Sequence, residues 1–173
     1  MTAGAMRKRI DTISLIGMPG VGKSTVGVVL AKTLGLAFVD TDLCIQLREH
    51  ATLQDVLERS GYRYLRSVEE AVLLSLPLAG VIATGGSVVY SDAAMRRLRA
   101  AGPVVYLQAG LATLKRRVAA APPRGIACAA GDSFDSIFAE RSELYQQQAD
   151  IRVAVEGLDV EQVVQRIVTA LDA

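Results

Sequence analysis

Residues that commonly bind transition metals are scarce in this sequence. It holds one histidine, His50, and two cysteines, Cys44 and Cys128, which lie far apart and form no C-x-x-C pair. A zinc site needs about four such ligands at characteristic spacings, so the composition argues against a zinc-dependent protein. Two isolated thiols also provide no disulfide framework, and we expect both to be free in a reducing cytosol.

An excess of one charge and long apolar runs are missing as well. The formal net charge is +1, which indicates no broad basic surface, so we expect no nucleic-acid partner. No stretch approaches the roughly 18 apolar residues of a membrane span. The short basic segment 1–9 is not followed by the apolar run of a signal peptide. We therefore expect a cytoplasmic protein with no membrane partner, and the length fits one domain over residues 1–173.

Short apolar runs alternate with helical patterns along the chain. The expected strands are Thr12 to Ile16, Leu36 to Val39, Val81 to Ala83, Val104 to Leu107 and Ile151 to Val155. The expected helices are Lys23 to Leu34, Asp42 to Glu49, one capped by Thr52, Tyr64 to Leu76, Ser91 to Ala100, Leu111 to Ala119, Ser133 to Gln147 and Asp159 to Leu171. This alternation predicts an α/β fold with a parallel sheet covered on both faces, and in such folds ligands bind at the carboxyl ends of the strands.

A glycine-rich loop follows the first expected strand. Its sequence, G-M-P-G-V-G-K-S from Gly17 to Ser24, matches G-x-x-x-x-G-K-[ST] at every required position. Glycines let the backbone N–H groups of such a loop point at phosphate oxygens, and the next helix adds the positive end of its dipole. Lys23 supplies a cation to the β- and γ-phosphates and Ser24 a hydroxyl to magnesium. The motif predicts a site for ATP and Mg²⁺ formed by Gly17, Gly20, Val21, Gly22, Lys23, Ser24 and Thr25.

Two carboxylates follow the second expected strand, in Asp40-Thr41-Asp42. Both are expected near the phosphate loop. Magnesium-dependent phosphoryl transfer needs one anionic group near the metal and another near the attacking hydroxyl. On this evidence alone, Asp42 could also be the N-cap of the next helix, and the two roles are compatible.

Three arginines are further candidates, although each one taken alone could be a solvated surface residue. Arg66 and Glu69 are three residues apart on an expected helix and can pair on one face. Arg141 lies on the expected helix after a segment rich in alanine, proline and glycine. That segment, about 119–131, has the composition of a mobile lid, and Arg124 within it would close over bound nucleotide.

Taken in order, these motifs resemble the shikimate kinase family from about Ile13 to Ala170. The elements that carry the resemblance are the phosphate loop, Asp40-Thr41-Asp42, Leu65-Arg66-Ser67-Val68-Glu69 as an F-R-x-x-E-like element, Thr84-Gly85-Gly86, and Arg141-Ser142-Glu143-Leu144-Tyr145 as R-x-x-L-Y. The chain departs from the family pattern at three positions. Ser87 stands where the third glycine of G-G-G is usual, Leu65 replaces an aromatic residue, and Gly125 replaces the proline of an R-P-L-like lid.

The resemblance implies a nucleoside-monophosphate-kinase type of fold, with three layers, a five-stranded parallel sheet in the order 2-3-1-4-5 and a mobile lid. It also implies roles on the nucleotide side. Lys23 and Ser24 would serve ATP and magnesium, with Asp40 reaching the metal through water. Arg124 would be the lid arginine on the phosphates, and Arg117 stands where the family places an arginine that stacks on adenine.

On the acceptor side, the resemblance implies that Asp42 holds the substrate hydroxyls and acts as the base. Arg66, Arg141 and the backbone of the Gly85-Gly86 pair would hold the substrate carboxylate, with Glu69 orienting Arg66. The implied reaction is phosphorylation of the 3-hydroxyl of shikimate by ATP, in a monomer.

Other acceptors remain open, namely gluconate, another hydroxy acid or a hydroxy amino acid, since two arginines facing a carboxylate fit all of these. A nucleotide-binding regulator without an acceptor is disfavoured because the loop residues and both aspartates are present. A GTPase switch is disfavoured because the chain has no N-K-x-D motif.

Overall fold

The computed structural model describes residues 10–173, so the expectation about segment 1–9 lies outside the described residues. One sheet of five parallel strands forms the centre, in the order β2-β3-β1-β4-β5. The strands are β1 Thr12–Ile16, β2 Phe38–Asp40, β3 Gly80–Ala83, β4 Val104–Gln108 and β5 Ile151–Ala154. The α/β fold and the 2-3-1-4-5 strand order expected from the sequence are confirmed.

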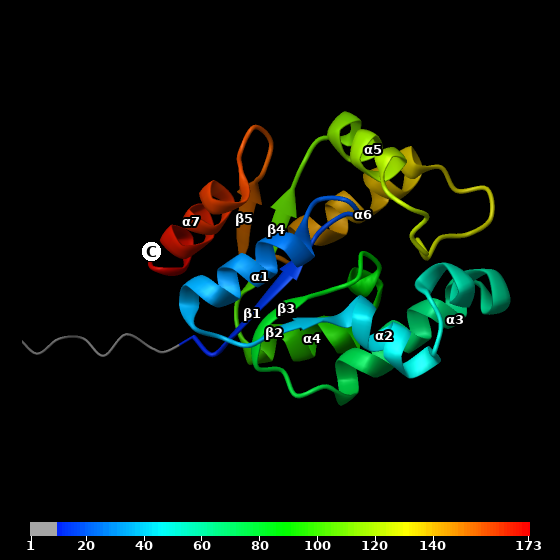
Figure 1. Ribbon diagram of the computed structural model, residues 1–173, viewed down its shortest axis with the longest axis horizontal. Coiled ribbons are helices and arrows are strands. Elements are labelled where there is room, and N and C mark those ends of the chain that lie inside the picture. Colours follow the sequence, from blue (N-terminus) through cyan, green and yellow to red (C-terminus); the bar gives the residue numbers. More distant parts are fainter. Residues whose placement is uncertain (1–9) are drawn as a thin grey trace, which may run out of the picture.

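Helices cover both faces of the sheet (Figure 1). The α-helices are α1 Lys23–Leu34, α2 Thr41–Glu49, α3 Leu53–Ser75, α4 Asp92–Ala101, α5 Leu111–Ala120, α6 Phe134–Gln148 and α7 Val160–Leu171. Helices α1 (blue) and α7 (red) pack together on one face, whereas α3, α4 and α6 lie on the other. None of the helices within residues 10–173 is long and apolar enough to cross a membrane.

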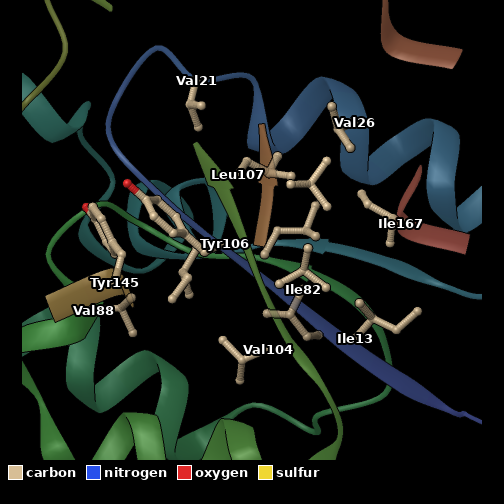
Figure 2. Close-up of a cluster of buried hydrophobic side chains, with 14 of the residues drawn as sticks. Ile13, Val21, Val26, Ile82, Val88, Val104, Tyr106, Leu107, Tyr145 and Ile167 are labelled. Atoms are coloured by element: carbon tan, nitrogen blue, oxygen red, sulfur yellow. The ribbon is translucent and has the colours of Figure 1, made fainter. Parts of the chain in front are cut away.

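The core lies around the central strands. All residues of β1 are buried, as a strand between two parallel neighbours and two helical layers requires. In Figure 2, apolar side chains of β1, β3 and β4 meet those of the covering helices, and Tyr106 of β4 lies beside Tyr145 of α6. Their ring centroids are 5.2 Å apart. This packing holds the carboxyl ends of the strands, where the candidate site lies, on a rigid base.

Three elements differ from those expected from the sequence. The helix capped by Thr52 and the helix expected from Tyr64 are one element, α3, which bends where Gly61 adopts φ 80° and ψ 168°. A short 3-10 helix, η1 Val88–Tyr90, was not expected either. Strand β2 begins at Phe38, later than expected, because the N–H of Leu36 still bonds the Ala31 carbonyl and closes α1.

Candidate active site

The phosphate loop connects β1 to α1 in a conformation that requires glycine. Gly17 has φ 148°, and a Cβ there would lie 2.6 Å from the Leu107 carbonyl oxygen. Gly22 is the N-cap of α1, with φ 103° and no side chain to bond the first N–H groups. Those donors therefore stay available at the positive end of the helix dipole, where a phosphate binds favourably.

Lys23 is held by the loop itself. Its Nζ donates to the carbonyl oxygens of Gly17, at 2.7 Å, and Met18, at 3.1 Å. Burial of the ammonium group lowers the pKa of Lys23 to about 8, against the opposing charges of Asp42 and Glu69. The group therefore remains mainly protonated at neutral pH.

Asp40 joins the end of β2 to the start of α1. One of its oxygens, Oδ2, accepts a 2.6 Å hydrogen bond from the Ser24 hydroxyl. The other, Oδ1, accepts from the N–H of Asp42 at 2.9 Å and caps α2. The alternative that Asp42 caps this helix is therefore wrong, because the strand runs one residue further than expected and Asp40 takes the cap position.

This hydroxyl and carboxylate pair fits a magnesium ion. Mg²⁺ prefers hard oxygen ligands and keeps several waters and substrate phosphates, so one or two protein oxygens suffice. Within residues 10–173 no cluster of three or more histidine, cysteine or acidic side chains could hold a metal alone. The oxygens of Ser24 and Asp40 are the groups that would hold the ion beside a bound phosphate.

Two further carboxylates lie against Gly85, at the end of β3. A Cβ on Gly85 would collide with Oε1 of Glu69 and lie 3.0 Å from Oδ1 of Asp42. Burial raises the pKa of Asp42, opposed chiefly by the Lys23 charge. Burial also raises the pKa of Glu69, to about 7, although a hydrogen bond from Ser87 opposes the shift. The missing side chain at Gly85 thus lets the two acidic groups approach the backbone at the end of β3.

Arg66 and Arg141 form hydrogen bonds with the lid rather than with the acidic side chains. The Nη2 atoms of Arg66 and Arg141 both donate to the backbone carbonyl of Ala127, at 3.1 and 2.6 Å. The Arg66 guanidinium lies 3.8 Å from the ring centre of Tyr90, and that of Arg141 lies 5.4 Å from it. The expected ion pair between Arg66 and Glu69 is not formed: Arg66 bonds the Ala127 carbonyl, and Oε2 of Glu69 accepts from Ser87.

The lid connects α5 to α6 and reaches the beginning of α3 (Figure 1). Gly125 lies so close to the backbone of Leu53 that a Cβ would collide with the Leu53 carbonyl oxygen. Ala127 is 5% exposed and packs with the apolar residues between α2 and α3. In this conformation the lid covers the two arginines.

Most of the predicted residues surround one cavity of about 530 Å³. Its wall includes Gly20, Val21, Gly22, Lys23, Ser24, Thr25, Asp42, Gly85, Arg117 and Arg124. Arg117 crosses the phosphate loop and donates to the Val21 carbonyl at 3.2 Å. Five predicted residues are not in the wall, namely Gly17, Asp40, Arg66, Gly86 and Arg141. The two arginines are separated from it by Ala127, which does line the cavity.

Several supporting residues were missed from the sequence. Tyr90 contacts both arginines, the Thr41 hydroxyl accepts from the Gly85 N–H at 3.1 Å, and the Tyr145 hydroxyl donates to the Gly86 carbonyl. Thr41 lies between the two aspartates, and Tyr145 closes the R-x-x-L-Y element, so both positions carried a signal. Nothing in the local sequence distinguishes Tyr90 from other surface aromatics.

A phosphate loop on a parallel 2-3-1-4-5 sheet, with a carboxylate in the same cavity and paired arginines beside it, defines a P-loop phosphotransferase that acts on small molecules. A family model described as shikimate kinase matches residues 19–172. The chain belongs to the shikimate kinase family. It is 37% identical over 168 residues to the shikimate kinase of Paracidovorax citrulli (strain AAC00-1), which covers 93% of this chain and 92% of that relative.

Solved structures of shikimate kinases superpose on this chain. Shikimate kinase from Acinetobacter baumannii in complex with shikimate superposes with a TM-score of 0.84 at 27% identity, over 95% of this chain and 94% of that one. Shikimate kinase from Aquifex aeolicus vf5 gives a TM-score of 0.78 at 32% identity, over 92% and 95% of the two chains. The similarity therefore extends over nearly the whole chain.

Proposed function

We propose that this chain transfers the γ-phosphoryl group of ATP to the 3-hydroxyl of shikimate. The observation that carries the proposal is one cavity whose wall contains both the phosphate loop and the Asp42 carboxylate. Membership of the shikimate kinase family supports the choice of acceptor. Donor phosphate and acceptor hydroxyl would then meet between Lys23 and Asp42.

The nucleotide side is assigned to the loop. The open N–H groups at the start of α1 would bind the phosphates, and Lys23 would bridge their oxygens in place of its present carbonyl partners. Ser24 and Asp40 would hold Mg²⁺, which neutralises phosphate charge during transfer. Arg124 and Arg117, both at the cavity, would contact the phosphates and the base respectively.

The acceptor side is assigned to the two arginines that lie behind Ala127, next to the cavity. Arg66 and Arg141 both donate to one carbonyl oxygen, so their guanidinium groups already converge on a single acceptor atom. A carboxylate in that position would accept charge-assisted hydrogen bonds, which are about twice as strong as neutral ones. Gly86 lies close to Arg141, where its backbone would contact the acceptor, and Ala127 would have to move for the acceptor to bind.

Asp42 would receive or orient the hydroxyl proton. It faces Lys23 closely enough that the two charges shift each other's pKa. A carboxylate within reach of the attacking hydroxyl, on the acceptor side of the transferred phosphoryl group, can act as the base or hold the nucleophile in line.

The protein is also proposed to work as a monomer in the cytoplasm. Its free thiols, Cys44 and Cys128, suit a reducing compartment.

The product tests this function. Incubation with ATP, Mg²⁺ and shikimate should give a phosphate monoester on the oxygen at C3, located by ³¹P–¹H correlation NMR. An analogue without the 3-hydroxyl is the control, which should inhibit through its carboxylate but accept no phosphate. Phosphate on another oxygen, or transfer to the analogue, would contradict the proposal.

A further inference from the structure

Glu69 and Ser87 occupy an unusual position between two cavities. Both residues line the main cavity and a second one of about 330 Å³, on whose wall are also Arg66, Glu70 and Tyr90. Glu69 is 4% exposed and Ser87 is 6% exposed. A carboxylate at this wall has room to turn toward either cavity, so its orientation needs a specific contact.

Ser87 supplies that contact. Its hydroxyl donates a hydrogen bond to Oε2 of Glu69, at the point where β3 passes into η1. The other oxygen, Oε1, is buried and has no hydrogen-bond partner. It lies against Gly85, beside Oδ1 of Asp42. A buried acceptor without a partner is costly, which marks a place where a ligand donates a hydrogen bond.

We propose that Ser87 is a positioning residue for phosphoryl transfer, which holds Glu69 with Oε1 turned to the acceptor pocket, where it accepts a hydrogen bond from a hydroxyl of the acceptor. This inference rests on the proposed function, since it concerns how the same site binds a polyhydroxylated acid. Asp42 and Glu69 together then accept hydrogen bonds from more than one hydroxyl of that acid. Ser87 acts on the acceptor through Glu69.

Charge supports this arrangement. The charged groups that face Glu69 come from three elements, namely Asp42 of α2, Lys23 of α1 and Arg141 of α6. Burial and Asp42 raise the pKa of Glu69, whereas the Ser87 hydrogen bond lowers it. Ser87 thus keeps a larger share of Glu69 ionised near neutral pH, the form that accepts hydrogen bonds on both oxygens.

Ser87→Ala, assayed with ATP, Mg²⁺ and shikimate from pH 6 to pH 9, tests the inference. Loss of a hydrogen bond to a charged group raises the carboxyl pKa by about one to two pH units. The ratio of variant to wild-type kcat/KM for shikimate should therefore fall about tenfold between pH 9 and pH 6. KM for ATP should stay within about twofold, because Ser87 acts on the acceptor.

Ser91→Ala is the matched control. Ser91 donates to Glu70 as Ser87 does to Glu69, and it also caps α4, yet it does not line the main cavity. Its removal should lower the melting temperature while the kcat/KM ratio stays constant with pH. In a Glu69→Gln background, Ser87→Ala should likewise cause no pH-dependent change. If Ser87→Ala does not fold, Ser87→Gly removes the same hydroxyl.

A ratio that is equally reduced, or unchanged, at pH 6 and pH 9 would overturn the role of Ser87, since a purely structural contribution has no reason to depend on the charge of Glu69. A wild-type protein that phosphorylates no shikimate at any pH would instead contradict the proposed function. The two failures are therefore distinguishable.

Discussion

The Nη2 atom of Arg141 donates a 2.6 Å hydrogen bond to the backbone carbonyl of Ala127, a lid residue. Arg141 is 1% exposed, so its guanidinium group is covered in the ligand-free protein. On the proposed function, the acceptor carboxylate and the Ala127 carbonyl would compete for this guanidinium group, and the lid would open before the acceptor binds.

Gly125→Ala tests whether the lid packs against the beginning of α3. A Cβ at this position collides with the Leu53 carbonyl, so the lid should lift from α3. Hydrogen exchange of amides in residues 121–131 should then become about tenfold faster in the ligand-free protein, because the packing that protects them is lost. Ala130→Ser, at an exposed lid position, is the control and should leave exchange unchanged. Equal exchange in Gly125→Ala and wild type would contradict the packing of the lid on α3.

In the wild type, hydrogen exchange of the lid amides should slow further when nucleotide and acceptor bind.

Lys23→Met should leave the fold intact and lower kcat by about 10²–10³-fold, because the cation that neutralises developing phosphate charge is lost. Removing a buried ammonium should not lower the melting temperature, since burial already disfavours its charge. Lys32→Met, in the last turn of the same helix, is the control and should turn over at the wild-type rate. Near wild-type turnover in folded Lys23→Met would exclude the loop as the phosphate site.

Asp42→Asn and Asp40→Asn should separate the acceptor side from the metal side. Asp42→Asn should lower acceptor-dependent ADP release by about 10²-fold or more and leave ATP affinity unchanged. Asp40→Asn should mainly weaken the dependence on Mg²⁺, and its stability should change little because asparagine also caps helices well. Loss of ATP affinity in Asp42→Asn would reverse the two assignments.

Glu69→Gln should stabilise the ligand-free protein at high pH. Burial raises the pKa of Glu69 from 4.5 to about 7, so the folded state loses stability as the pH rises through this interval. Below pH 4.5 the carboxyl is protonated in both states and the penalty vanishes. The variant should therefore exceed wild type by on the order of 2–3 kcal/mol at pH 8 and match it at pH 4. Denaturant unfolding measures this, with Glu70→Gln as the control. A stability difference that does not vary with pH would contradict the burial of an ionisable Glu69.

The phosphate loop could be predicted from sequence because its function depends on local backbone geometry. Positive φ angles at Gly17, Gly20 and Gly22 leave a residue pattern that is specific on its own. The strand and helix pattern was similarly local and predicted a parallel sheet, whereas the strand order was implied by the family resemblance. The expected bounds differ from the observed ones mainly at caps, as with Asp40.

The contacts of the acceptor-side residues could not be predicted from the sequence in the same detail. The partner of both arginines is a backbone carbonyl, and the alanine that carries it has no side-chain signal. The expected pairing of Arg66 with Glu69 followed from helical spacing. In the structure, the Glu69 carboxylate instead accepts a hydrogen bond from the hydroxyl of Ser87, 18 residues further along the chain. Such contacts depend on how β3, η1 and the lid meet in three dimensions.

Initial rates of coupled ADP release show whether the site prefers shikimate, the proposed acceptor. Shikimate, gluconate and homoserine should be compared with ATP and Mg²⁺ under the same conditions. We expect kcat/KM for shikimate to exceed the values for the other two by about 10²-fold or more, because misplaced hydroxyls leave buried polar groups unpaired. An equal or greater rate with gluconate or homoserine, or no stimulation by any acceptor, would contradict it.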